Sequence, residues 1–348
     1  MSTSSLVVQG TKSGVLLLNI GSPEEPTRSA VGKYLRRFLG DGRVIDLPAA
    51  LRWMLVNLII VPFRAGKSAK RYATIWTSAG SPLIRHSLAQ AAALKEKLPG
   101  VEVEAAMRYS EPLLETTLEK MLSAGVTQLV VVPMYPQYAS ASTASALDGV
   151  FQYLSKRSFV PAVRIVGAFY DDPAWLDSVA AGIEKTCAEM NADHLLFSYH
   201  GLPLNQLQDT TRPTGGVCGT SGCCDRLTSK NHGCYRAQCV ATSAALTARF
   251  PKLPVSTSFQ SRLKGRQWIE PYTDVVLVEL AKKGVKRLAV ACPSFVSDCL
   301  ETLEEIGVEA RDIFRAAGGE DLRLVPCVND DPPFIAALAQ MVRRELER

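Results

Sequence analysis

Residues 15–23 read VLLLNIGSP and residues 195–203 read LLFSYHGLP, so one pattern occurs once in each half of the chain. In both copies a short apolar run ends in Gly-x-Pro, as expected for a buried strand followed by a turn. A second pair occurs in the same order, GVTQLVVVP at 125–133 and GVKRLAVACP at 284–293. Two matches in one order favour a duplicated unit over chance similarity of α/β sequences.

Short apolar runs alternate with longer amphipathic stretches along the whole chain. Each run fits a strand buried on both faces, and the alternation predicts right-handed crossovers and parallel sheets. The sequence therefore predicts an α/β fold of two similar Rossmann-like lobes, each a four-stranded parallel sheet flanked by helices. The expected strands are residues 15–20, 101–106, 129–133 and 164–166, then 194–199, 255–259, 288–292 and 322–326.

The length of 348 residues also favours two units, because single hydrophobic cores rarely grow that large. We expect the first lobe to cover residues 1–170 and the second to cover residues 171–332. The final helix, residues 333–348, is expected to pack back across the seam between the lobes.

Composition and charge exclude several classes of protein. The chain is 47% apolar and 21% charged, as ordinary globular proteins are. Its net charge of +5 suits an anionic small molecule or membrane surface, and no Lys/Arg stripe interleaved with aromatics indicates nucleic-acid binding. The first residues lack the pattern of a signal peptide, so we expect a cytoplasmic protein without disulfides. The longest apolar run, 55–63, is too short to span a bilayer.

In open parallel sheets, ligands bind beyond the carboxyl ends of the strands, so residues at those ends should converge on one cleft between the lobes. His200 directly follows an expected strand and could bind a metal or accept a proton near neutral pH. A lone histidine is more often structural, and its place at a strand end is what favours function. We interpret the other three histidines as structural or exposed.

The segment SDCLETLEEI at 297–306 is expected to be a helix with Asp298, Glu301 and Glu305 on one face. Acidic residues are common in the first turn of a helix because of its dipole, but Glu305 lies beyond that turn. Oxygen ligands in a row suit transient handling of an ion such as Fe²⁺.

Six motifs together resemble those of bacterial ferrochelatases, in family order. They lie at residues 17–48, 107–112 (MRYSEP), 131–143 (VVPMYPQYASAST), 197–203, 259–274 (FQSRLKGRQWIEPYTD) and 297–306. The resemblance implies two lobes around a porphyrin, with His200 and Glu301 as catalytic residues that also bind the Fe²⁺ substrate. Whether His200 is metal ligand, base or both stays open. Asp298 and Glu305 would pass protons outward or iron inward.

The same resemblance implies a porphyrin pocket at the strand ends. Arg108 could pair with a propionate, while aromatic faces pack against the ring; core packing is the alternative for Tyr109 and Trp268. The expected substrate is protoporphyrin IX, with coproporphyrin III as the nearest alternative. A catalytically inactive haem- or iron–sulfur-binding sensor is the alternative from another class. The pocket residues are Ile20, Ser22, Met107, Arg108, Tyr109 and Trp268.

Residues 47–71 correspond to the apolar lip of the family. An apolar segment followed by Arg64, Lys67, Lys70 and Arg71 is also typical of a helix that lies on a membrane surface. An ordinary buried helix with a basic end is the alternative. We expect peripheral contact with the inner face of the cell membrane rather than a membrane span.

Five of the nine cysteines lie in one insertion, residues 212–239. Their spacing lacks the C-x-x-C pairs typical of zinc sites and resembles looser iron–sulfur spacings. Some bacterial ferrochelatases hold a [2Fe–2S] cluster in such a segment, which implies the same cofactor here. Four ligands are needed, and the spare cysteine could be Cys223, Cys224 or Cys239. The five candidates are Cys218, Cys223, Cys224, Cys234 and Cys239.

Overall fold

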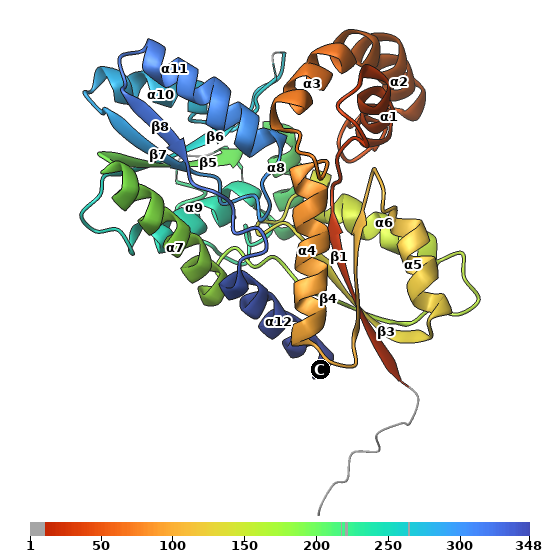
Figure 1. Cartoon of the computed structure of the whole chain (residues 1–348). Helices are drawn as coiled ribbons and strands as arrows, with labels where there is room; N and C mark the ends of the chain where they lie inside the picture. Colours follow the sequence, from red (N-terminus) through yellow and green to blue (C-terminus); the bar gives the residue numbers. More distant parts are fainter. Residues whose placement is uncertain (1–10, 217, 220–221, 264) are drawn as a thin grey trace, which may run out of the picture.

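Two four-stranded parallel sheets with flanking helices form two lobes that lie side by side (Figure 1). The computed structural model describes residues 11–216, 218–219, 222–263 and 265–348. The strand order is β2-β1-β3-β4 in the first lobe and β6-β5-β7-β8 in the second. These sheets confirm the fold that the sequence predicts.

All eight expected strands are present, with shifts only at their ends. Val15 and Leu16 of β1 and Leu195 and Leu196 of β5 are fully buried, as continuous apolar runs require when helices cover both faces of a sheet. The strands are β1 (Lys12–Asn19), β2 (Glu102–Met107), β3 (Val126–Pro133), β4 (Ala162–Ile165), β5 (His194–His200), β6 (Val255–Gln260), β7 (Arg287–Ala291) and β8 (Asp321–Leu324).

The two lobes agree in register as well as in strand order. Asn19 of β1 lies opposite Met107 of β2, and Tyr199 of β5 lies opposite Phe259 of β6. The amide of Met107 donates to the carbonyl of Pro112 at 2.7 Å, and the amide of Phe259 donates to that of Pro271 at 2.8 Å. The repeated sequence pattern is therefore a repeated structure.

Helices cover both faces of each sheet. Those of the first lobe are α4 (Pro82–Lys97), α5 (Leu114–Ser123) and α6 (Ser145–Leu154). Those of the second are α7 (Pro173–Met190), α9 (Tyr235–Thr247), α10 (Thr273–Lys282) and α11 (Arg311–Ala316). The second lobe also contains α8 (Leu204–Thr211), which follows β5 and leads into a short 3₁₀ turn at Arg212–Thr214.

One buried hydrophobic cluster runs through both lobes, and each lobe has a further buried cluster of its own. Val15 and Leu17 of β1 belong to the same buried cluster as Leu195 and Phe197 of β5. The last helix, α12 (Pro332–Leu346), contacts α4, β3 and β4 of the first lobe and α7 of the second, and lies between them in Figure 1. The shared cluster and α12 therefore join the two lobes at the seam.

A long helix stands beside α1 (Arg28–Leu39) at the end of the first lobe. It runs continuously from Ala49 to Ile75 as α2 (Ala49–Met54), the π-helix η1 (Leu55–Ile60) and α3 (Val61–Ile75), and we call it the lip helix. By length and composition it could span a bilayer, which the apolar run 55–63 alone did not indicate. One side packs on α1 through a cluster that includes Val31, Val56 and Ala65.

Two further segments are π-helical, η2 (Ser140–Ala144) and η4 (Leu300–Ala310). The π-helix is rare, appears mostly as a single turn, and is frequent at functional sites. At 11 residues, η4 is much longer than that. It occupies the segment where the sequence predicts an α-helix, and it begins at Leu300, after a capping box formed by Cys299 and Thr302.

Candidate active site at the strand ends

His200 is the last residue of β5, and its side chain is fixed in one tautomer. Its Nδ1 lies 2.6 Å from the carbonyl oxygen of Gly201, which can only accept, so Nδ1 carries the proton. Within the described part of the chain Nε2 has no hydrogen-bond partner. The lone pair of Nε2 is therefore available to a proton or to a metal ion.

The main chain of His200 is held on both sides. Its amide donates to Ser294 Oγ at 3.1 Å, and its carbonyl accepts from the hydroxyl of Tyr235 at 2.9 Å. Burial lowers the pKa of the imidazole, while the carboxylate of Glu301 acts in the opposite direction. The lowered pKa keeps His200 neutral near pH 7, which is the form that can accept a proton.

Glu301 lies on the first turn of η4, where the second lobe faces the lip helix. Its negative charge acts on His200 and, next to burial, raises the pKa of Tyr72 on α3. Burial and the neighbouring Tyr72 raise the pKa of Tyr34 on α1, and Glu301 adds to this effect. The structure thus brings together a histidine from β5, a carboxylate from η4, and one tyrosine each from α1 and the lip helix.

Glu305 follows Glu301 along η4 and is an unusual carboxyl group. Burial raises its pKa to about 7, the hydroxyl of Ser261 lowers it, and the charge of Glu301 raises it further. Ser261 Oγ lies 3.0 and 2.8 Å from the two carboxylate oxygens. A group with a pKa near the working pH suits proton transfer in either direction.

Asp298 does not share a helix face with the two glutamates, contrary to the expectation from the sequence, because η4 begins after it. Its buried carboxylate accepts from Thr302 Oγ1 at 3.1 Å, from the amide of Cys327 at 3.3 Å and from Asn329 Nδ2 at 2.8 Å. These bonds fix the start of η4 to the loop after β8. A role of Asp298 in the proton or metal path remains a prediction.

Met107 and Tyr109 are buried, and Arg108 is already paired. The Tyr109 hydroxyl lies 2.9 Å from Asp41 Oδ2 and 2.7 Å from Ser145 Oγ. Arg108 Nη2 lies 3.5 Å from Asp41 Oδ2, and its Nε donates to the carbonyl of Ser145 at 3.0 Å. A propionate at Arg108 would meet a guanidinium whose charge Asp41 largely balances.

The loop after β1 packs tightly against the loop after β2. Gly21 has φ +98°, and a Cβ there would lie 2.4 Å from Ser110 Oγ, so glycine is required. The amide of Ser22 donates to the same oxygen at 3.1 Å, and the amide of Tyr109 donates to the carbonyl of Ile20 at 3.2 Å. Ile20 and Ser22 therefore adjoin Tyr109 at the end of the first sheet.

Trp268 lies beside His200 rather than in the first lobe. A Cβ on Gly201 would lie 3.4 Å from Cε3 of the Trp268 ring. The side chain is 9% exposed, and its indole N–H has no partner in the described residues. Trp268 also forms an isolated bridge with Pro203, so this predicted porphyrin residue lies against the loop that directly follows His200.

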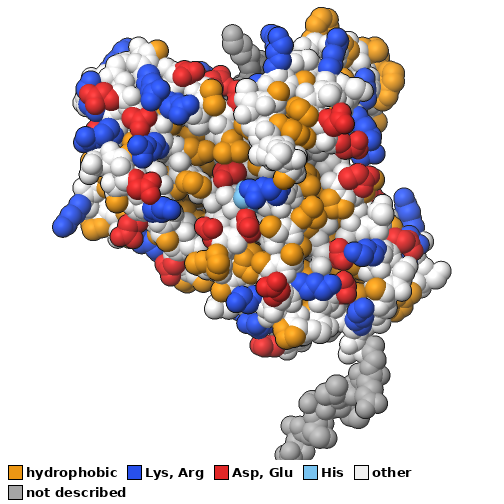
Figure 2. Space-filling view, viewed as in Figure 1, with side chains coloured by type: hydrophobic (Ala, Val, Ile, Leu, Met, Phe, Trp, Pro, Cys, Tyr) orange, Lys and Arg blue, Asp and Glu red, His pale blue; other side chains and the backbone are white. Residues whose placement is uncertain are grey.

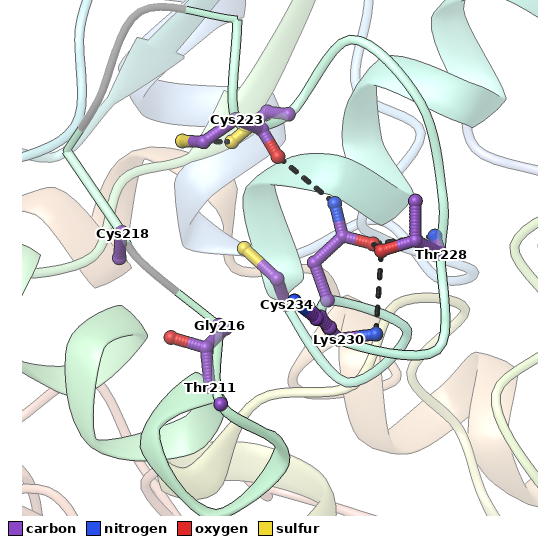
Figure 3. Close-up of a pocket in the computed structure, with 10 residues that line it drawn as sticks. Thr211, Gly216, Cys218, Cys223, Thr228, Lys230 and Cys234 are labelled. Carbon is purple, nitrogen blue, oxygen red and sulfur yellow. Dashed lines mark hydrogen bonds between the residues drawn. The ribbon is translucent and has the colours of Figure 1, made fainter.

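Four of the five candidate cysteines line one cavity of about 250 Å³ in the insertion (Figure 3). They are Cys218, Cys223, Cys224 and Cys234. Cys223 Sγ and Cys224 Sγ lie 3.5 Å apart, and a hydrogen bond from the Cys224 thiol lowers the pKa of Cys234. Cys239 is completely buried and does not line the cavity.

The thiols around this cavity are not close enough together to bind a metal ion in the described conformation. No group of three His, Cys, Asp or Glu side chains among the described residues is arranged to hold a metal ion. Figure 3 shows the sulfur of Cys234 directed into the space below Cys223. The cysteines would have to draw closer together around a bound group.

Several residues at the site were not singled out from the sequence. Ser261 lies directly after β6, Asp41 lies within the motif 17–48, and Tyr235 lies immediately after Cys234. Position after a strand indicates the segment 259–262 that contains Ser261, but it does not indicate this residue or its contact with Glu305. Nothing in the local pattern indicates that Asp41 would pair with Arg108 or that Tyr235 would reach His200.

A solved structure shares the fold of this chain. This structure is the sirohydrochlorin chelatase SirB from Bacillus subtilis subspecies spizizenii in complex with cobalt. The two chains superimpose with a TM-score of 0.52 at 14% sequence identity, and the match covers 97% of this chain and 96% of SirB. At this identity the likeness shows the fold alone, which is that of the chelatases.

Sequence comparison identifies the family. The ferrochelatase family model matches residues 12–346. A ferrochelatase from Coxiella burnetii is 43% identical, with coverage of 98% of this chain and 96% of the relative. A ferrochelatase from Bdellovibrio bacteriovorus is 42% identical, and the match covers 95% of this chain and 99% of the relative. The chain belongs to the ferrochelatase family.

Proposed function

We propose that this protein inserts Fe²⁺ into protoporphyrin IX to form protohaem, with release of two protons. The observation that carries the proposal is the Nε2 of a neutral His200, which has no hydrogen-bond partner among the described residues. The charge of Glu301 acts on this imidazole, and Gln260 joins the strand of His200 to the main chain of Glu301. Family membership supports the reaction class, a lyase that chelates metal.

The chemistry requires two pyrrole N–H protons to leave while iron exchanges water for ring nitrogens. His200 would take one proton at Nε2 or hold the incoming iron, and the charge of Glu301 would stabilise the imidazolium that forms. Glu305, with its pKa of about 7, would pass protons between this pair and solvent. Ser294, Tyr235 and Gly201 keep the imidazole in place during the transfer.

The substrate is tested by measuring turnover with protoporphyrin IX and coproporphyrin III side by side, under anaerobic conditions with Fe²⁺. We expect the higher kcat/KM with protoporphyrin IX. Faster turnover of coproporphyrin III would identify that ring as the substrate instead. If both rings bind and neither is metallated, the protein is an inactive haem or iron–sulfur sensor on the same scaffold.

A [2Fe–2S] cluster is the second part of the proposal. A cluster of this type takes four thiolates, and the number and kind of side chains around the cavity in the insertion match that need. When bound, the cluster would supply one-electron redox chemistry. We propose Cys218, Cys223, Cys224 and Cys234 as its ligands and Cys239 as the spare, because Cys239 is buried outside the cavity.

We also propose that the lip helix makes a peripheral contact with an anionic membrane on its cytoplasmic side. Its outer face carries large exposed side chains, among them Trp53 at 59%, Leu58 at 59% and Phe63 at 75% exposure. Figure 2 shows hydrophobic side chains gathered at the edge of the molecule formed by α2 and the start of α3, with Lys and Arg nearby. An apolar face with basic neighbours suits the plane of the interface.

Replacing Leu58 and Phe63 by glutamate is expected to weaken binding to anionic vesicles by at least about tenfold, since burying one such side chain contributes about 1.5–3 kcal/mol. Vesicle co-sedimentation measures the effect. Phe159→Glu is the matched control, because Phe159 is also exposed, at 56%, but belongs to the loop between α6 and β4 and not to the lip helix. Equal loss in both proteins would contradict a specific contact through the lip helix.

A further inference from the structure

The end of strand β6 touches both parts of the active site. Gln260 lies opposite His200 in the β5–β6 register, and its carbonyl accepts the amide of Gly201 at 2.8 Å. Its side chain reaches the other way, where Nε2 donates to the main-chain carbonyl of Glu301 at 2.7 Å. One residue therefore joins the strand that carries the imidazole to the helix that carries the carboxylate.

Gln260 is itself held firmly. The side chain is 3% exposed, and its Oε1 accepts from Ser198 Oγ at 2.8 Å. Ser198 lies on β5, two residues before His200. With both ends of the amide engaged, Gln260 cannot rotate away from Glu301 without breaking a buried hydrogen bond.

Ser261, which follows Gln260, forms hydrogen bonds with Glu305, which lies beyond Glu301 along η4. Ser261 donates to both carboxylate oxygens of Glu305, and it does so from a backbone conformation with φ +65°. Few residues other than glycine adopt this conformation, because it strains the main chain. Glycine would relieve that strain but would remove the hydroxyl, so the serine is explained by its contact with Glu305.

Arg71 lies near the carboxylate of Glu305 but forms its ion pairs with other glutamates. Arg71 of α3 forms ion pairs with Glu304 and Glu309, on either side of Glu305 along η4. Ser261 is therefore the group that donates directly to Glu305 among the side chains described.

We infer that Gln260 and Ser261 are positioning residues that set the spacing of His200, Glu301 and Glu305. Gln260 fixes the first turn of η4 against β5, and Ser261 fixes the orientation of the Glu305 carboxylate one turn later. The inference rests on the proposed function, because it assumes that these three side chains handle iron and protons.

Three replacements of Ser261 separate the hydroxyl from the backbone strain. Ser261→Ala removes the donor and keeps the strain, and Ser261→Gly removes the donor and relieves it. Ser261→Asn restores a donor in a residue that tolerates positive φ. We expect kcat/KM for Fe²⁺ to fall about tenfold or more in the alanine and glycine variants, as for loss of one hydrogen bond to a charged group. The asparagine variant should recover most of it.

The control readouts are the KM for porphyrin and the melting temperature. The porphyrin KM should stay near the wild-type value in all three variants, and Ser261→Gly should melt at the same or a higher temperature than wild type. A Ser261→Gly protein with wild-type kcat/KM for Fe²⁺ would overturn the inference, as would an equal loss in the asparagine variant. Failure of the proposed function looks different, because the wild-type protein itself would then not metallate either porphyrin.

Discussion

Replacing His200 by alanine is expected to reduce Fe²⁺ insertion by about 10²- to 10⁴-fold, the range for loss of a positioned general acid or base. The protein should fold normally, because the side-chain hydrogen bond of this residue goes only to the carbonyl of the neighbouring Gly201. Porphyrin fluorescence under anaerobic conditions follows the loss of free ring, and circular dichroism checks the fold.

The control for this variant lies on the same strand. His194 begins β5, and its Nε2 lies 2.9 Å from Ser256 Oγ. Because His194→Gln leaves the carboxyl end of the strand unchanged, it should retain near wild-type turnover. Substantial turnover by the His200→Ala protein would show that His200 is not a catalytic residue. Glu301 would then have no imidazolium to stabilise.

Alanine replacement of each cysteine in the insertion is expected to divide the five into two groups. Cys218→Ala, Cys223→Ala, Cys224→Ala and Cys234→Ala should each lose the cluster, because a [2Fe–2S] centre with three thiolates lacks one iron ligand. Cys239→Ala should keep it. Iron and sulfide content, together with visible absorption of the purified protein, measures the cluster directly and does not depend on activity.

Two results would contradict the ligand assignment. Cluster loss in Cys239→Ala together with retention in one of the other four would show that the cavity does not identify the ligands. A colourless wild-type protein loaded with zinc would instead exclude a cluster.

Removal of the cluster should destabilise the insertion more than the rest of the fold, because the four thiols would no longer be held together by a bound group.

Local sequence was sufficient to predict the two sheets. Buried parallel strands need continuous apolar runs, and Val15–Leu18 and Leu195–Phe197 supply them without help from the rest of the chain. The position of His200 follows from the same logic, since the carboxyl end of a parallel strand is where ligands bind.

The arrangement around His200 could not be predicted in the same way. The period of apolar residues in 297–306 fits an α-helix, whereas η4 is a π-helix that starts after Asp298 is tied to Thr302 and Asn329. The bond from Asn329 to Asp298 joins segments far apart in sequence, as does the bond from Gln260 to Glu301. Such contacts depend on the folded structure, and no local periodicity encodes them.

The two lobes match in fold but differ at the strand end that carries His200. The repeat places Ile20 in the first lobe where the second lobe has His200, so a hydrocarbon side chain and an imidazole occupy equivalent strand ends. A flat macrocycle bound between these ends would have the imidazole of His200 on one face and the side chain of Ile20 on the other. Both pyrrole protons would then leave on the His200 side, although the two lobes repeat the same strand order.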